Sequence, residues 1–191
     1  VLGRIRKFQK RHGSRQVQSR WAYAKRLNME LSRKTAAAIT DYARDYHADV
    51  LVFEYLEMNG KITGSKKQKL HLWRKRDVQK ICEHQAHWNG IRVSRVCARN
   101  TSRLAYDGSG LVARNPENHS LCVFQNGKQY NCDLSAAYNI GARYFIRELL
   151  KPFSETERSS LEEKVPSVKR RTSCVYADLR LLSAELDGSA A

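Results

Sequence analysis

The sequence predicts an α/β fold, because a buried strand, an amphipathic helix and a second strand follow one another in the middle of the chain. Residues 48–54 are mostly apolar and end in Glu54, which is the pattern of a central strand covered by helices. Apolar residues then recur at helical spacing over residues 70–88 and stop before Gly90. Residues 91–97 alternate apolar and basic side chains. This order predicts a right-handed crossover between two parallel strands.

Two further helices are predicted, one on each side of this segment. Residues 14–47 contain neither Pro nor Gly, and their apolar residues recur every three or four positions, as in one long amphipathic helix. The apolar stripe comprises Val17, Trp21, Ala24, Leu31, Ala38 and Tyr42. Residues 133–150 predict another helix, with Asp133 as its N-cap and Pro152 just after its end. Its inward side chains are predicted to be Leu134, Ala137, Phe145 and Leu149.

The length of 191 residues favours one main compact unit with a core. We expect residues 1–97 to form its first part, and residues 98–131, rich in Gly, Asn, Ser and Asp, to form an inserted loop or small hairpin. Residues 132–152 contribute the last core helix, and residues 153–191 a partly disordered tail. Because the chain starts at Val1 in charged sequence typical of a domain interior, we expect the remainder of a larger polypeptide upstream.

The charge balance favours a nucleic-acid partner. The chain has 35 Lys and Arg against 19 Asp and Glu, which gives a formal net charge of +16. Residues 1–34 contain Glu30 as their only acidic residue, and a second basic run covers residues 61–80. A well-solvated surface without a specific ligand shows similar charge runs, so charge alone leaves the mode of binding open.

The cysteine content and hydropathy indicate an intracellular, soluble protein without a membrane partner. Five cysteines are an odd number, and no secretory segment precedes them, which argues against a disulfide framework. No stretch approaches the roughly 20 apolar residues that a membrane-spanning helix needs.

Two acidic residues stand at the ends of predicted elements. Glu54 ends the buried strand, at the edge where open α/β sheets place their sites, and Asp133 begins the third helix. Two carboxylates held together repel unless a divalent cation neutralises them, and oxygen ligands select Mg²⁺. Two such cations about 4 Å apart activate water and stabilise the leaving oxygen in phosphodiester hydrolysis. In the alternative interpretation, Glu54 only ends a strand and Asp133 only caps a helix.

The residues around both acids resemble the nuclease motifs of TnpB and the type V CRISPR effectors. The run from Asp49 to Leu56 is similar to the second RuvC motif of that superfamily. The run from Asp133 to Ile140, with its Ala-Ala and Asn-Ile pairs, is similar to the third motif and is the most specific part. Between them, Thr101 and Ser102 follow the family order, and the resemblance covers about residues 10–150.

The resemblance implies an RNase H-like (RuvC) fold, of which this chain holds the C-terminal portion. That fold uses three acidic metal ligands, and Glu54 and Asp133 match the second and third of them. The first, an aspartate on a strand before the long helix, is not in this chain. The implied cofactor is Mg²⁺ or Mn²⁺, which supports two-metal hydrolysis of DNA, with an RNA guide supplying sequence specificity.

The zinc ribbon that members of this superfamily commonly insert between the second and third motifs is degenerate here. Ala105 and Gly108 stand where cysteines of the ribbon are expected, and Gln125 stands where the partner of Cys122 is expected. The remaining candidate ligands are Cys97, Cys122, Cys132 and His119. Their spacing fits no standard zinc pattern, so zinc is not expected.

Basic residues are the predicted contacts to nucleic-acid phosphates, acting through charge rather than sequence readout. On the long helix of residues 14–47 and its start they are Arg15, Arg20, Lys25, Arg26, Arg33 and Lys34. In the loop and helix that follow the first strand they are Lys66, Lys67, Lys69, Arg74, Lys75 and Arg76. The resemblance implies a guide RNA and a target DNA as partners, in a prokaryotic cytoplasm at the nucleoid.

The sequence leaves three functions open. The first is a metal-dependent, RNA-guided DNA endonuclease domain in which Glu54 and Asp133 hold Mg²⁺. The second is a protein of the same fold that binds guide RNA and DNA but does not cleave. The third is a basic RNA-binding protein with a chance motif match, which predicts no divalent-cation site at Glu54 and Asp133.

Overall fold

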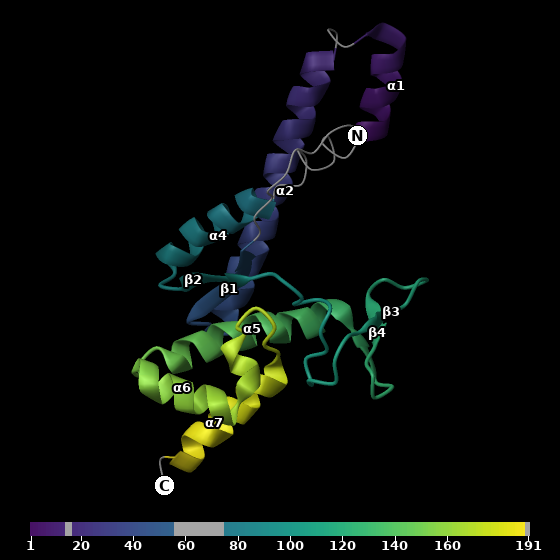
Figure 1. Ribbon diagram of the computed structural model, residues 1–191. Coiled ribbons are helices and arrows are strands. Elements are labelled where there is room, and N and C mark those ends of the chain that lie inside the picture. Colours follow the sequence, from purple (N-terminus) through teal and green to yellow (C-terminus); the bar gives the residue numbers. More distant parts are fainter. Residues whose placement is uncertain (14–16, 56–74, 190–191) are drawn as a thin grey trace. The chain divides into compact units, whose positions relative to one another are not determined.

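The computed structural model describes residues 1–13, 17–55 and 75–189 (Figure 1). The chain has a mixed α/β fold that divides into two compact units, where the sequence predicted one. Unit 1 comprises Val1–Leu51 with Met58–Val93, and unit 2 comprises Val52–Glu57 with Ser94–Ala191. Glu54 and Asp133 therefore belong to the same unit. No helix in the described ranges is long and apolar enough to cross a membrane.

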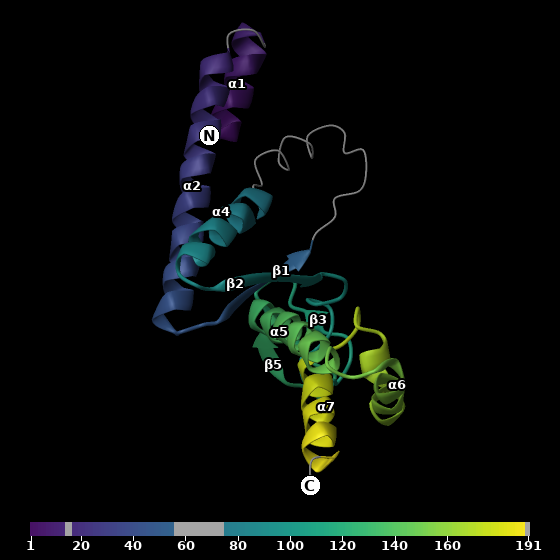
Figure 2. The same ribbon diagram turned by 90° about the vertical axis from the view of Figure 1, so that its left-hand side faces the viewer.

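Two helices form the N-terminal part of unit 1. Helix α1 spans Leu2–His12 and was not predicted, whereas α2, Gln18–Asp45, confirms the long helix expected in residues 14–47. The two helices lie side by side over the first part of α2 (Figures 1 and 2). Ile5, Val17 and Ala24 form the buried cluster between them. The Arg20 guanidinium also stacks 4.0 Å from the Phe8 ring centroid, which makes α1 part of a folded unit.

The buried face of α2 changes along the helix. Val17 and Ala24 are buried as predicted, but Leu31 and Tyr42 are exposed. The buried residues of the second half are small: Ser32, Ala36, Thr40 and Ala43. Helix α4, Lys75–Trp88, packs here, and its Cys82 thiol lies 3.7 Å from the Ala36 carbonyl oxygen. The predicted stripe was wrong in this half because small side chains allow the helices to approach closely, whereas the large apolar residues remain outside.

Strands β1, Val50–Tyr55, and β2, Arg92–Cys97, pair in a two-stranded sheet, with α4 between them in the chain. The strand–helix–strand order agrees with the predicted crossover. In unit 1, the start of this sheet is covered by a cluster of Ala43, Ala86 and Ile91, with Leu51 and Val93 packed against it. The expected basic loop of residues 55–68 lies outside the described residues, apart from Tyr55 itself.

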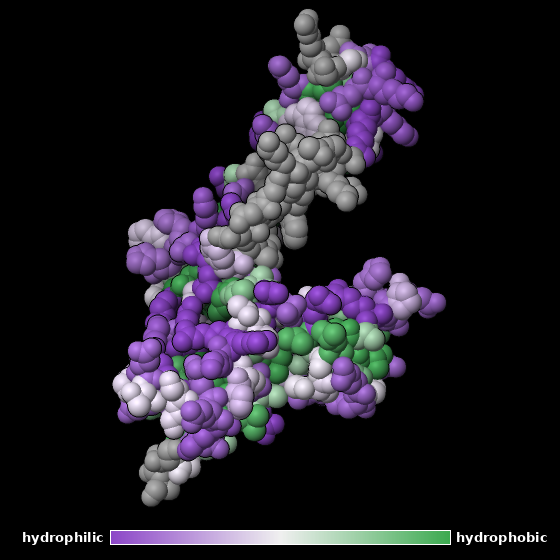
Figure 3. Space-filling view, in the orientation of Figure 1, coloured by the Kyte–Doolittle hydropathy of each residue, from purple (hydrophilic) through white to green (hydrophobic). Residues whose placement is uncertain are grey.

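The insertion in unit 2 is a small antiparallel sheet. Strands β3, Ala113–Arg114, β4, Leu121–Val123, and β5, Gln129–Asn131, pair in this order, which agrees with the predicted hairpin. Its core consists of Ala105, Cys122, Phe124 and Cys132. Side-chain packing thus holds this insertion together. Figure 3 shows hydrophobic residues at the surface over β3, β4 and the start of α5.

Helix α5 spans Cys132–Leu150 and confirms the third predicted helix. Its N-cap is Asn131 rather than Asp133, because the Asn131 side chain accepts hydrogen bonds from the N–H groups of Asp133 and Leu134. The predicted inward face is confirmed for Leu149, which packs against the core, but it was wrong for Ala137, which is exposed, and for Leu134 and Phe145, which are 55% and 51% exposed. The buried residues of α5 are Cys132, Ser135, Asn139, Ala142, Arg143, Tyr144, Ile146 and Leu150. Asn139 and Arg143 are buried on this face because their side chains bind backbone groups of neighbouring segments.

Residues 153–189 are folded, in contrast to the partly disordered tail expected for residues 153–191. Helix α6, Glu155–Lys164, a 3₁₀ turn, Pro166–Lys169, and α7, Tyr176–Ser189, follow α5. They bury a cluster of Ile146, Leu150, Leu161, Val165, Val168, Cys174 and Leu182. Burial of each aliphatic side chain stabilises the fold by about 1.5–3 kcal/mol. The segment is polar on average, so its composition did not indicate this core. Ser154 and Glu157 form a capping box that starts α6.

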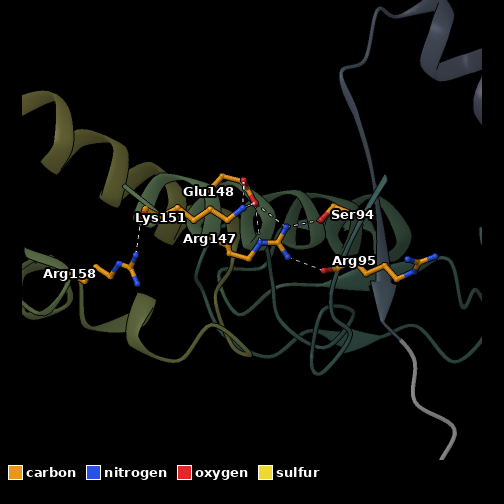
Figure 4. A network of polar contacts seen from close by, with 6 residues as sticks. All are labelled: Ser94, Arg95, Arg147, Glu148, Lys151 and Arg158. Atoms are coloured by element: carbon orange, nitrogen blue, oxygen red, sulfur yellow. Dashed lines mark hydrogen bonds and ion pairs between the residues drawn. The ribbon is translucent and has the colours of Figure 1, made fainter. Parts of the chain in front are cut away.

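Helix α5 is attached to β2 through Arg147 (Figure 4). Its guanidinium donates to the carbonyl oxygen of Arg95 at 3.1 Å and to the hydroxyl of Ser94 at 2.7 Å. The Glu148 carboxylate forms ion pairs with Arg147 and Lys151. The hydrogen bonds from these two residues lower the pKa of Glu148, and the bond from Lys151 has the largest effect. The strand and the helix are therefore fixed within unit 2.

Gly110→Ala and Gly141→Ala are expected to change stability in opposite directions. Gly110 has a φ of +116°, a backbone conformation that strains any residue with a Cβ, so we expect the free energy of unfolding of Gly110→Ala to fall by about 1–3 kcal/mol. Gly141 lies inside α5 with no atom within 4 Å of an added Cβ. Gly141→Ala is therefore expected to raise the free energy of unfolding by about 0.5–1 kcal/mol. Urea denaturation measures both, and a shift of the same sign in both variants would contradict the geometry.

Candidate functional site

Glu54 lies near the end of β1 and is half-buried. Its Oε1 accepts a hydrogen bond from the Thr101 hydroxyl at 2.6 Å. This is a short hydrogen bond, at the lower end of the distances that hydroxyl donors and oxygen acceptors adopt. The structure thus holds the Glu54 carboxylate in a defined orientation.

Thr101 belongs to the turn that follows β2, and it is only 1% exposed. Its backbone N–H and its hydroxyl both lie within hydrogen-bond distance of the Ala98 carbonyl oxygen, at 3.4 and 3.0 Å. A β-branched side chain is stiff about χ1, so this turn fixes the direction of the hydroxyl. The end of β2 therefore supplies the partner of the carboxylate on β1.

Asn139 connects this turn to helix α5. It is 0% exposed, and its Nδ2 donates to the carbonyl oxygens of Thr101 at 3.0 Å and Leu104 at 2.9 Å. Its Oδ1 accepts from the N–H of Tyr176 at 3.2 Å. The amide thus joins the turn after β2 and the start of α7, Tyr176–Ser189, to helix α5, and a hydrogen-bonded path runs from Glu54 through Thr101 to α5.

Asp133 is the second residue of α5 and is exposed. At this position its negative charge is stabilised by the positive end of the helix dipole. Asp133 and Asn139 lie six residues apart on the same helix, which is about 9 Å along its axis. The path from Glu54 therefore reaches the helix that carries Asp133.

Arg143 is a buried cation next to this path, and it is 4% exposed. Its guanidinium donates to the carbonyl oxygens of Cys97 and Arg99, both at 2.7 Å, and of Cys174 at 3.1 Å. Burial lowers the pKa of Arg143, and the charges of Cys97, Cys174 and Glu54 oppose that shift. Its Nη2 has no hydrogen-bond partner among the described residues. Arg143 therefore places a positive charge near Glu54 while it fixes the end of β2.

The structure thus connects Glu54 and Asp133 within one unit through Thr101 and Asn139. Within the described ranges, no three His, Cys, Asp or Glu side chains gather as a group able to hold a metal ion. The residues of this site that can supply oxygen ligands to a cation are the two carboxylates.

The predicted phosphate contacts lie in unit 1. Those that the structure describes are exposed: Arg20, Lys25, Arg26, Arg33, Lys34 and Arg76. Lys34 lies 3.4 Å from Glu30 in an exposed ion pair. Hydrophilic side chains cover α1 in Figure 3. The side chains of the others are outside the described part of the chain: Arg15, Lys66, Lys67, Lys69, Arg74 and Lys75.

All five cysteines are free thiols, as expected from the absence of a disulfide framework. Cys82, Cys122, Cys132 and Cys174 are buried and Cys97 is exposed. Burial is the main cause that raises the pKa of Cys122 and of Cys174 to about 11, which keeps both thiols protonated at neutral pH. They pack as small apolar side chains.

Sequence reasoning did not assign Thr101, Asn139 or Arg143 to the site. Thr101 and Asn139 belong to the segments that carry the family resemblance, so that resemblance was the available signal. Arg143 stands four residues after Asn139 and shares its helix face, but a basic residue on a helix is normally exposed, and its burial was not predictable.

Comparisons with known proteins identify a related fold. No protein-family model matches this chain, and no curated protein sequence is significantly similar to it. The structure is similar to that of Cas12f1, solved by cryo-electron microscopy in a complex with sgRNA and target DNA, with a TM-score of 0.53 and 19% sequence identity. The match covers 73% of this chain and 39% of the Cas12f1 chain. The chain spans less than half of that protein's length and shares the fold of part of it.

Proposed function

We propose that this chain carries part of a RuvC-type nuclease centre, in an RNase H-like fold, where Glu54 and Asp133 hold Mg²⁺ for the hydrolysis of RNA-selected DNA. The observation that carries the proposal is the hydrogen-bonded path from Glu54 through Thr101 to Asn139. It ties a strand-end carboxylate to the helix that begins with the second carboxylate. The fold similarity to part of Cas12f1 supports the same assignment.

The donor set fits a hard divalent cation. Both side chains are carboxylates, which Mg²⁺ and Mn²⁺ prefer to nitrogen or sulfur ligands. When bound, the cation would lower the pKa of a water molecule and polarise the scissile phosphate. The protein orients the Glu54 carboxylate through Thr101 and exposes the Asp133 carboxylate at a helix start. These residues supply positioning rather than covalent chemistry.

The exposed basic residues of α2 are suited to nucleic-acid phosphates. Arg20, Lys25, Arg26 and Arg33 lie along one long helix, and their charges attract a polyanion without reading its sequence. In the proposed function they contact guide RNA or DNA, and base pairing to the guide selects the target. Cas12f1 was solved in a complex with sgRNA and target DNA, which are partners of the same kind.

Cleavage of labelled single-stranded DNA tests the proposal. The assay uses this chain and a version extended upstream, with Mg²⁺ or Mn²⁺, and a chelator as the control. We expect cleavage that requires the metal and binding that weakens as salt is raised. Tight, salt-sensitive binding without cleavage by either protein would contradict the nuclease and favour a protein that binds RNA and DNA without cutting.

A further inference from the structure

The bond between Thr101 and Glu54 is a short contact from a buried hydroxyl to a half-buried carboxylate. The two residues are 47 positions apart in the chain, and the Oγ1–Oε1 distance is 2.6 Å. Thr101 is 1% exposed, so bulk water does not compete freely for its hydroxyl proton. A contact of this kind restricts the rotamers of a glutamate, whose three χ angles are otherwise mobile.

The hydroxyl has one proton and two acceptors within reach. Glu54 Oε1 lies at 2.6 Å, and the Ala98 carbonyl oxygen lies at 3.0 Å. An ionised carboxylate is the stronger acceptor and is also the closer one, so the proton points to Glu54. A serine at this position keeps the donor, whereas a valine keeps the shape and removes the donor.

The position of Thr101 is in turn set by α5. Asn139 is fully buried and uses both atoms of its amide, because Nδ2 binds the Thr101 and Leu104 carbonyl oxygens and Oδ1 accepts from Tyr176. A rotation of this amide would break all three bonds. The Thr101 backbone therefore moves with α5, and α5 also carries Asp133.

We propose that Thr101 and Asn139 are positioning residues that hold the Glu54 carboxylate in register with Asp133, so that both carboxylates bind one divalent cation. The inference rests on the proposed function for the role of Glu54 and Asp133, and it adds two residues that are not metal ligands. Groups that orient a ligand typically change metal affinity by about 10–100-fold when removed.

The test compares Thr101→Val with Thr101→Ser in the full chain, using Mn²⁺ as the probe. Ser102→Ala is the matched control, since it removes the neighbouring hydroxyl. Water-proton relaxation measures the Mn²⁺ affinity, and the carbon-13 resonance of the Glu54 carboxyl carbon is recorded without metal. Thermal unfolding of each variant separates a local effect from loss of the fold.

We expect Thr101→Val to weaken Mn²⁺ binding by about 10-fold or more and to shift the Glu54 resonance. Thr101→Ser and Ser102→Ala should remain close to wild type in both measurements, and all variants should stay folded. If Thr101→Val changes neither the Mn²⁺ affinity nor the Glu54 resonance, Thr101 does not position the carboxylate.

Glu54→Gln separates this inference from the proposed function. If Glu54→Gln leaves Mn²⁺ affinity unchanged, the metal role of Glu54 fails. The metal-free resonance still decides whether Thr101 orients the carboxylate. If Glu54→Gln weakens Mn²⁺ binding and Thr101→Val does not, the proposed function stands and the positioning role fails.

Discussion

Asp133→Asn is expected to reduce metal-dependent DNA cleavage by at least about 100-fold, because residues that merely orient a metal ligand already account for about 10–100-fold. Asn131 caps α5 through the Asp133 backbone N–H, which the substitution keeps, so the helix should form normally. The measurement is the single-turnover rate of cleavage of labelled DNA at saturating protein, in Mg²⁺.

Glu155→Gln is the matched control, since it also removes one negative charge from the first turn of a helix in unit 2. We expect it to cleave like the wild type. If Asp133→Asn and the wild type cleave at the same rate, Asp133 only occupies a helix start, and the nuclease assignment of this site is wrong.

Asn139→Leu is expected to lower the free energy of unfolding of unit 2 by at least about 3 kcal/mol, because a buried polar group without a partner costs about 1–3 kcal/mol. The variant leaves the carbonyl oxygens of Thr101 and Leu104 and the N–H of Tyr176 without the amide. Hydrogen exchange should become faster in α5 and in residues 98–104. Exchange in α2 and α4, which belong to unit 1, should remain unchanged.

Asn118→Ala is a suitable control for this experiment, because Asn118 is exposed and its side chain accepts only a local bond from the Ser120 N–H. We expect Asn118→Ala to change the free energy of unfolding by no more than about 0.5 kcal/mol. Uniformly faster exchange in both units after Asn139→Leu would contradict a role confined to unit 2. If hydrogen exchange in α5 is unchanged, the Asn139 side chain contributes little to holding α5 against its neighbouring segments.

The elements that the sequence predicted well are those with local causes. The apolar run before Glu54 became β1, and the periodicity from residue 133 onward became α5. Their partners depend on distant residues. The face of α2 opposite Leu31 is buried because small residues meet α4, and the polar face of α5 is buried because Asn139 and Arg143 bind loop carbonyls. Periodicity in one helix does not contain this information.

The candidate site shows the same division. Glu54 and Asp133 were selected because each stands at the end of a predictable element, and the structure places both in one unit. Thr101 could not be assigned a partner from sequence. It follows β2, whereas Glu54 lies in β1, and the two residues are 47 positions apart in the chain with helix α4 between them. Helices α6 and α7 were missed because their contacts with α5 come from scattered apolar residues, such as Leu161 and Leu182.

Anomalous scattering of Mn²⁺ in crystals of this chain shows whether Glu54 and Asp133 share a divalent cation. We expect an anomalous peak within about 2.0–2.6 Å of an oxygen of each carboxylate, at the distances of hard-cation ligands. The same peak should disappear in Asp133→Asn. A peak bound by Glu54 alone, or Mn²⁺ bound elsewhere with both carboxylates empty, would contradict the account.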